Sequence, residues 1–270
     1  MPKLTIDGKQ IEVPGGLNLI QAAERAGIEI PHYCYHPGLT VVGNCRMCLV
    51  EIEKAPKLQI ACNTSVAEGM VVHTQSPRTR TAQKAVLEFL LVNHPIDCPV
   101  CDQAGECKLQ DYYMDYDRQP SRFPLGKKNH KGKAIDVGSG VMLDQERCIL
   151  CARCTRFFDE ITKSSELAIF ERGDGCKIDI WPGKPVDNKY AGNVVDICPV
   201  GALTEKDFRF RMRLVSAADA VGVRGMRARL LDRHSSSSRA HLPLEAALQS
   251  RRQQLLDVRR GAARISRAAE

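Results

Sequence analysis

The cysteines of this chain gather in three short segments, and this pattern constrains the fold more than any other feature. All 12 cysteines lie before residue 199, and 11 of them fall into three sets with ligand-like spacing. The sets are Cys34, Cys45, Cys48 and Cys62; Cys98, Cys101 and Cys107, with His94 just before them; and Cys148, Cys151, Cys154 and Cys198. Because the sequence has no nucleophile–base signature, the sets predict a row of metal or iron–sulfur centres that carry electrons.

Length and composition favour several small units, each built around a bound group. The 270 residues have room for one or two ordinary domains, but only 5% are aromatic and Trp181 is the single tryptophan. The start of the chain has no secretory signal, and no apolar run reaches the length of a membrane span. We therefore expect a reducing cytoplasm, where clustered cysteines bind metals or clusters more often than they form disulfides.

The net charge of +7 does not predict nucleic-acid binding. Most of the excess lies after Leu214, in a segment that contains arginine but no lysine, and residues 1–213 are close to neutral. A charge confined to one end of the chain gives no basic face for a nucleic acid.

Strand and helix signals predict an α+β fold that begins with a β-grasp unit. Two short alternating strands flank Asp7-Gly8, and Asn18 is a good N-cap for a following helix. Further strands are expected at 49–53, 58–61 and 70–73. The long loop after the first helix would hold three cysteines of the first set.

The rest of the chain is expected to contain less regular structure. A helix should begin at Ser76-Pro77 and end near His94, followed by cysteine-rich loop to about residue 123. The charged segment GKKNHKGK (126–133) suggests a linker. Beyond it, we expect a loop entering a helix over 148–162, strands at 167–171 and 177–181, and a helix at 191–197.

The first set has the spacing C-x10-C-x2-C-x13-C. Two cysteines at x2 spacing can chelate one iron from a single turn, as in the C-x4-C-x2-C pattern of plant-type ferredoxins. Gly43-Asn44 before Cys45 suits a tight loop that turns backbone N–H groups toward cluster sulfurs. The spacing favours an iron–sulfur cluster and leaves a structural zinc site open.

The second set has the spacing H-x3-C-x2-C-x5-C, one cysteine short of the four that a cubane cluster needs. His94 stands where a fourth ligand would be expected. Two alternatives remain open: His94 could end its helix and bond a last-turn carbonyl, or the set could be a Cys3His zinc site.

The third set is the most specific, because C-x2-C-x2-C with a distant Cys-Pro resembles the bacterial ferredoxin pattern. No second complete triplet precedes Cys198-Pro199, which predicts a ferredoxin-type domain that kept one cluster. Three ligands so closely spaced would crowd a single zinc ion. Cys176 is left over and is expected to be a free thiol.

Three strings carry a resemblance to a known family. They are NHPIDCPVCDQAGECKLQD (93–111), VMLDQERCILCARCTRFFDEIT (141–162) and NVVDICPVGALTEKDFRFRMR (193–213). Together they resemble the large iron–sulfur subunit of bacterial NADH:quinone oxidoreductase, respiratory complex I, and the likeness covers about residues 1–213.

The resemblance implies three cluster-binding domains. A [2Fe–2S] cluster is expected on the first set in a ferredoxin-like β-grasp domain at 1–77. A [4Fe–4S] cluster is expected on His94 and its three cysteines in a small helical domain at 78–125. A second [4Fe–4S] cluster is expected on the third set in a ferredoxin-like domain at 126–213. Arg46, in the ligand loop of the first set, and Arg153, in that of the third, are candidates for tuning the clusters by charge.

The same resemblance implies an electron relay without an active site of its own. Members of the family take electrons from the flavin subunit that oxidises NADH and pass them toward quinone. The implied partners are that flavin/NADH-binding subunit and other subunits of the peripheral arm, with no nucleic acid and only indirect contact with the membrane. The implied location is the cytoplasmic side of the bacterial inner membrane.

The segment 214–270 departs from the family, whose members continue into a long domain resembling molybdopterin oxidoreductases. It is rich in Arg and Ala and has an SSSS run, so it is expected to be disordered or the product of a shifted reading frame. With suitable codons, a shifted frame of 223–231 spells CEGCARGC and one of 245–261 spells RPRFNPDVNSCWMCDEG, both family-like.

Two other functions remain open from the sequence. The diaphorase iron–sulfur subunit of a soluble NAD-linked hydrogenase shares the three cluster domains and is naturally short. A zinc-stapled binding module is the third possibility, which metal analysis would separate from the other two.

Overall fold

The computed structural model describes residues 1–117, 120 and 122–209. All of them belong to the first of two units, Met1–Arg211, so the fold below is that of this unit alone. The two interpretations of segment 214–270 fall outside the described residues. No helix in the described part of the chain is long and apolar enough to cross a membrane.

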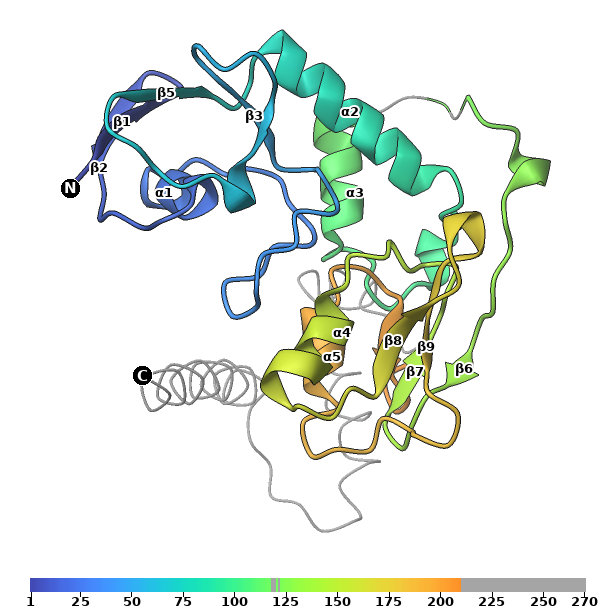
Figure 1. Ribbon diagram of the computed structural model, residues 1–270. Coiled ribbons are helices and arrows are strands. Elements are labelled where there is room, and N and C mark those ends of the chain that lie inside the picture. Colours follow the sequence, from blue (N-terminus) through green and yellow to red (C-terminus); the bar gives the residue numbers. More distant parts are fainter. Residues whose placement is uncertain (118–119, 121, 210–270) are drawn as a thin grey trace, which may run out of the picture. The chain divides into compact units, whose positions relative to one another are not determined.

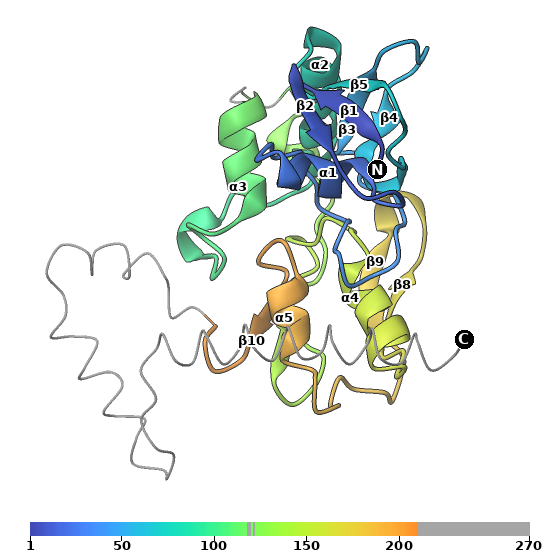
Figure 2. The same cartoon turned by 90° about the vertical axis from the view of Figure 1, so that its left-hand side faces the viewer.

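A five-stranded mixed sheet forms the N-terminal part of the unit (Figures 1 and 2). Its strands, in the order β2-β1-β5-β3-β4, are β1 (Lys3–Ile6), β2 (Lys9–Glu12), β3 (Leu49–Ile52), β4 (Gln59–Ile60) and β5 (Met70–His73). Strand β1 runs parallel to β5 and antiparallel to β2, across the predicted Asp7-Gly8 turn. The predicted strands are confirmed, and so is the α+β class.

Helix α1 (Leu19–Arg25) covers this sheet and shares its apolar core. It begins with a capping box, in which Asn18 Oδ1 accepts from the Gln21 N–H at 3.0 Å and Gln21 Oε1 accepts from the Asn18 N–H at 3.1 Å. Gly27 ends it in the left-handed conformation, at φ 71°. The helix that precedes the loop of the first cysteine set therefore begins and ends at signals in residues next to its own termini.

Helix α2 (Pro77–Leu91) follows the sheet, and Ser76 caps it by accepting from the Thr79 N–H at 3.2 Å. The helix predicted here is confirmed. The cysteine-rich segment after it is not all loop, because it contains α3 (Lys108–Tyr112) and a π-helical turn (Tyr113–Asp117) that packs against α2. Leu109 and Tyr112, one turn apart and both buried, form the short apolar face that sequence inspection overlooked.

The last described part contains two small sheets and two short helices (Figure 1). One sheet, in the order β10-β7-β6, consists of β6 (Ile135–Asp136), β7 (Val141–Leu143) and β10 (Leu203–Glu205), and the other pairs β8 (Leu167–Phe170) with β9 (Lys177–Ile180). The helices are α4 (Arg153–Arg156), which continues into a π-helical turn at Phe157–Ile161, and α5 (Asn193–Ile197). The β8–β9 hairpin and both helices were predicted, whereas the three-stranded sheet was not.

The segment that suggested a linker, 126–133, is fixed to its surroundings by side-chain hydrogen bonds. Lys128 Nζ donates to the carbonyl of His94 at 2.6 Å, and the Asn129 N–H donates to Asn93 Oδ1 at 3.0 Å. Lys133 Nζ lies 3.1 Å from Asp97 and 3.0 Å from Glu146. The segment is therefore part of the packing around the second cysteine set.

Candidate metal centres

The four cysteines of the first set converge, although 28 positions separate the first from the last. Cys34 and Cys45 come from the long loop after α1, Cys48 precedes β3, and Cys62 lies in the helical turn Ala61–Asn63 after β4. The thiols form hydrogen-bonded pairs, Cys34 with Cys45 and with Cys62, and Cys48 with Cys62. The Cys34 N–H also donates to Cys45 Sγ at 3.4 Å.

These thiol–thiol contacts shift the pKa values of the thiols in the first set in opposite directions. Hydrogen bonds from Cys45 and Cys62 hold the pKa of the Cys34 thiol far below its ordinary value. The reverse holds for Cys62, where the contacts with Cys34 and Cys48 raise the pKa well above its ordinary value. Four thiols this close cannot all ionise unless positive charge, such as iron, joins them.

The loop between the ligands is bent where the sequence predicted a tight turn. Gly43 has φ 61°, and a Cβ there would lie 2.7 Å from the side chain of Ile60. Arg46, between Cys45 and Cys48, has φ 58°, a left-handed conformation that is unfavourable for a residue with a side chain. The short x2 spacing thus requires a strained turn at this ligand pair.

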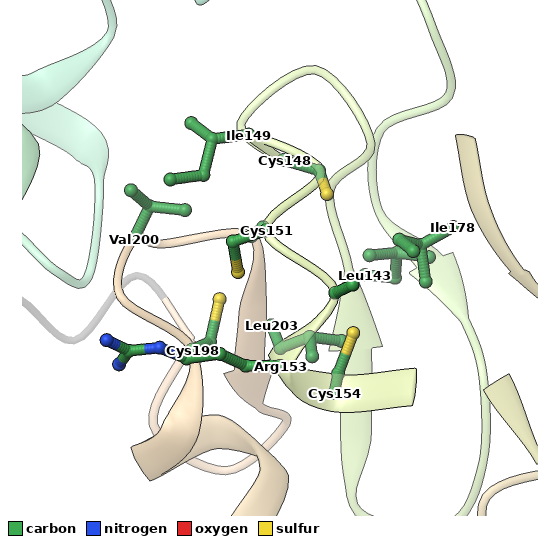
Figure 3. Close-up of a pocket in the computed structure, with 12 residues that line it drawn as sticks. Leu143, Cys148, Ile149, Cys151, Arg153, Cys154, Ile178, Cys198, Val200 and Leu203 are labelled. Carbon is green, nitrogen blue, oxygen red and sulfur yellow. The ribbon is translucent and has the colours of Figure 1, made fainter. Parts of the chain in front are cut away.

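The third set surrounds an apolar cavity (Figure 3). Cys148 and Cys151 come from the loop that enters α4, Cys154 lies in the first turn of α4, and Cys198 lies at the end of α5. Between the sulfurs, the walls are formed by Leu143, Ile149, Ile178, Val200, Ala202 and Leu203. Figure 3 shows the four sulfurs on different sides of the cavity.

Burial dominates the chemistry of this set. It raises the pKa of the Cys148 and Cys151 thiols to about 12 each, and that of Cys154 well above its ordinary value. Leu150 and Ala152 are left-handed, with φ 52° and 58°, and the Leu150 N–H donates to Cys148 Sγ at 3.4 Å. The set therefore offers four desolvated sulfurs on a backbone curled around them.

The second set brings three thiols near one another. Cys98 begins the helical turn Cys98–Val100, Cys101 follows that turn, and Cys107 precedes α3. Cys98 and Cys101 both act electrostatically on Cys107, whose thiol pKa burial raises to about 11. For Cys101, burial raises the thiol pKa and the nearby Arg147 guanidinium opposes the rise.

His94 is half-buried, and its Nδ1 ring nitrogen is buried. Its Nδ1 has no hydrogen-bond partner among the described residues, so the helix-end carbonyl bond considered from the sequence is not seen at this atom. Burial lowers the His94 pKa to about 4, against the opposing pull of Asp97. At neutral pH the ring is thus uncharged, the form in which imidazole binds metals.

The three sets meet in one buried core. Cys34, Cys107 and Cys151, one from each set, share a single buried core with Tyr33 and Val200. Gly201, three residues after Cys198, lies so close to the second set that a Cβ there would be 2.3 Å from Cys101 Sγ. The third set is therefore in contact with both of the others.

Two arginines of α4 fasten the first set to the third. Arg156 Nη2 donates to the carbonyl of Cys34 at 2.5 Å, and Arg153 Nη2 donates to the carbonyl of Tyr35 at 2.6 Å. Asn44 Nδ2 adds a bond to the carbonyl of Leu150 at 3.1 Å. The loop of the first set is thus held by the ligand loop of the third.

Unpaired donors around the cysteines fit a bound group that accepts hydrogen bonds. Buried polar atoms nearly always have a partner. In the described part of the chain, Tyr33 Oη, Arg147 Nη1 and Arg153 Nε are buried without one. Each lies within electrostatic reach of cysteines of these sets. The sulfides of an iron–sulfur cluster are acceptors of the kind these donors lack, so the residues present fit such clusters.

Two further observations concern a site for a single metal ion and the leftover Cys176. Among the described residues, no three His, Cys, Asp or Glu side chains come close enough to hold a single metal ion. Cys176 is a free, half-buried thiol and takes part in none of the contacts above. Sequence inspection missed Tyr33, Arg147 and Gly201, because their roles depend on which segments meet in space.

The fold and the three converging sets define an iron–sulfur protein of the ferredoxin-like class. Three family models match in chain order: "2Fe-2S iron-sulfur cluster binding domain" at residues 2–77, "NADH-ubiquinone oxidoreductase-G iron-sulfur binding region" at 83–122, and "NADH-quinone oxidoreductase subunit 3, ferredoxin-like domain" at 138–204. Over these residues the chain belongs to the NADH-ubiquinone oxidoreductase-G family, the iron–sulfur subunits of NADH-quinone oxidoreductase.

Curated relatives agree with this family. The chain is 46% identical over 213 residues to the corresponding NADH-quinone oxidoreductase subunit of Rickettsia bellii, covering 79% of this chain and 31% of that protein. It is 49% identical to the mitochondrial NADH-ubiquinone oxidoreductase 78 kDa subunit of Neurospora crassa, covering 78% and 28%. The chain thus spans less than a third of the length of these two relatives.

A solved structure shows a related architecture. A chain of an NAD+-reducing [NiFe]-hydrogenase is similar with a TM-score of 0.68 and 29% identity. The likeness covers 78% of this chain and 90% of that chain.

Proposed function

We propose that this chain is an electron relay of an NADH:quinone oxidoreductase, taking electrons from the flavin/NADH-binding subunit and passing them toward quinone. The observation that carries the proposal is the convergence of three cysteine sets in one buried core, where the third set contacts both of the others. A row of adjacent redox sites suits the passage of single electrons and needs no substrate pocket.

The ligand assignment follows the three sets. Cys34, Cys45, Cys48 and Cys62 would hold a [2Fe–2S] cluster, because their thiols already touch in pairs. The other two sets would each hold a [4Fe–4S] cluster: His94, Cys98, Cys101 and Cys107, and Cys148, Cys151, Cys154 and Cys198. Each cluster would supply one-electron redox chemistry when bound.

This chain's own residues would hold the sites close together and exclude water. The apolar walls around the third set and the shared core lower the local dielectric, and the arginines of α4 fix the spacing between loops. The domains proposed for the three sites are 1–77, 78–125 and 126–213. Family matches that begin and end near these positions support the division.

The proposed setting is the cytoplasmic side of a bacterial inner membrane, with contact to the membrane only through other subunits of the complex. Membership of a multisubunit complex is supported by the names of the relatives. The chain would contribute no active site of its own.

Metal analysis of the full chain tests the proposal. After anaerobic reconstitution we expect about ten irons and a similar amount of sulfide per chain, since two, four and four irons fill the three sites. Addition of the flavin/NADH-binding subunit and NADH should then reduce the clusters. Stoichiometric zinc with negligible sulfide would establish the zinc-stapled module instead.

One observation favours a second candidate. The solved hydrogenase chain is covered over 90% of its own length, against 31% for the Rickettsia bellii protein. A diaphorase subunit of an NAD-linked hydrogenase therefore stays the alternative. The proteins recovered with a tagged chain from its native cells would decide, because one function requires membrane quinone-reductase subunits and the other requires a soluble hydrogenase.

A further inference from the structure

An ion pair between a buried arginine and a half-buried aspartate joins the ligand loops of the second and third sets. Arg147 immediately precedes Cys148, and Asp97 immediately precedes Cys98. Arg147 Nη2 lies 2.8 Å from Asp97 Oδ2, and Arg147 Nε lies 3.2 Å from Asp97 Oδ1, so the guanidinium grips the carboxylate with two nitrogens. The Arg147 side chain is only 3% exposed.

Carboxylates outnumber cations around this pair. Asp144 Oδ2 lies 3.4 Å from Arg147 Nε, and Lys133 Nζ bridges Asp97, Asp144 and Glu146 at 3.0 to 3.7 Å. His130 also faces Glu146, at 2.9 Å. Because Arg147 and Lys133 face three carboxylates, the positive charge of the guanidinium is offset, and the pair acts on its neighbours mainly through directed hydrogen bonds.

One donor of this guanidinium is unused. Arg147 Nη1 is buried and has no partner among the described residues, although its two sister nitrogens bond to Asp97. The group lies within electrostatic reach of Cys101 and of His94, both in the second set. Leaving a charged donor unpaired inside a protein is costly, so a bound acceptor at the second site is the simplest account.

We propose that Arg147 is a positioning residue for two sites at once: its grip on Asp97 sets the spacing of the second and third ligand loops, and its free N–H donates to a sulfur at the second site. The proposal rests on the proposed iron–sulfur function. A hydrogen bond to cluster sulfur stabilises the extra negative charge of the reduced state, so Arg147 raises the reduction potential of the second site.

The test is Arg147→Lys in the full chain, reconstituted anaerobically. Lysine keeps the positive charge but cannot grip Asp97 with two nitrogens and still reach a sulfur. We expect unchanged iron and sulfide and a lower midpoint potential for the second-site EPR signal, which is assigned by its change in His94→Cys. The first-site potential should not move.

Arg153→Lys is the matched control. Arg153 also has a buried nitrogen without a partner, but it lies beside cysteines of the first and third sets. Its replacement should leave the second-site potential where it is in the parent chain. Equal second-site shifts in both variants would overturn the proposal, because the effect would then be general.

Three outcomes are distinguishable. A parent chain without iron and sulfide defeats the proposed function itself. A loaded Arg147→Lys chain with an unchanged second-site potential defeats only the role of Arg147, leaving it as a structural tie. If Arg147→Lys fails to load, the parent chain labelled with 15N-arginine decides: its second-site signal should show coupling to a guanidinium nitrogen, and absence of that coupling overturns the proposal.

Discussion

The first and third cysteine sets gather four sulfurs each, but by different means. In the first set the strongest influence on each thiol of the Cys34–Cys62 pair is another thiol. In the third set it is burial, and the sulfurs stand around a cavity with apolar walls (Figure 3). We call the first set a tight group, because its thiols touch in pairs, and the third set a cage, because its sulfurs surround a cavity.

This difference bears on the size of the group each set would hold. Sulfurs that touch in pairs suit a small two-iron cluster, in which two cysteines share each iron. Sulfurs on opposite walls of a cavity suit a larger four-iron cluster, in which each iron has one protein ligand. The difference in sulfur spacing supports the cluster types that we propose for the two sets.

Removing one ligand from each set is the largest test of this comparison. Cys154→Ser should lower the iron content by about four per chain, and Cys62→Ser by about two, since each cluster loses an essential ligand. Iron and sulfide analysis after anaerobic reconstitution measures both losses. Equal losses in the two variants would contradict the distinction between a tight group and a cage.

A methyl group at Gly201 tests the boundary between the cage and the second set. Its Cβ would lie 2.3 Å from Cys101 Sγ, so Gly201→Ala should destabilise the fold by about 1–3 kcal/mol and displace a second-site ligand. Thermal unfolding and the second-site EPR signal are the measurements. Gly140→Ala is the control, because its Cβ would meet no atom within 4 Å; the same loss in both variants would show that the contact is not specific.

His94→Cys extends the comparison to the kind of ligand. It should keep a cluster at the second site but lower its potential, because a neutral imidazole is replaced by an anionic thiolate. His94→Ala should weaken or lose that cluster alone. An EPR-monitored redox titration checks both, and spectra identical to the parent in every signal would exclude His94 as a ligand.

Cys176→Ser should have the smallest effect. Cys176 takes part in none of the thiol contacts of the three sets, so iron content and all EPR signals should match the parent chain. Loss of a four-iron signal would mean that the cage recruits this thiol and that its ligand set was assigned wrongly.

The sequence predicted those parts of the fold whose signals are local. Asp7-Gly8, the Asn18 capping box and the Ser76-Pro77 helix start each act within a few residues, and the structure confirms the elements that they begin. The β10-β7-β6 sheet was missed because its strands are two or three residues long and Leu203 pairs with Leu143, far away in the chain.

In the candidate sites, too, local features were predicted and contacts between distant segments were not. Cysteine spacing predicted three sets, and the cysteines of each set lie near one another in the structure, in part because those at x2 or x5 spacing follow closely along the chain. The Arg147–Asp97 pair and the contact between Gly201 and Cys101 were beyond prediction from the sequence. Each joins loops from different sets, and nothing in a single sequence says which loops will meet.

The shared core of Tyr33, Cys107 and Val200 has a consequence for how this protein can be taken apart or recombined. The three family models match separate segments of the chain, yet buried side chains from all three segments pack in one core. A fragment holding only the middle segment would expose Leu109 and Tyr112 to water and should fail to fold alone. Exchange of that segment between relatives should succeed only when its contact residues in the other two segments are exchanged with it. The three segments are therefore expected to evolve together.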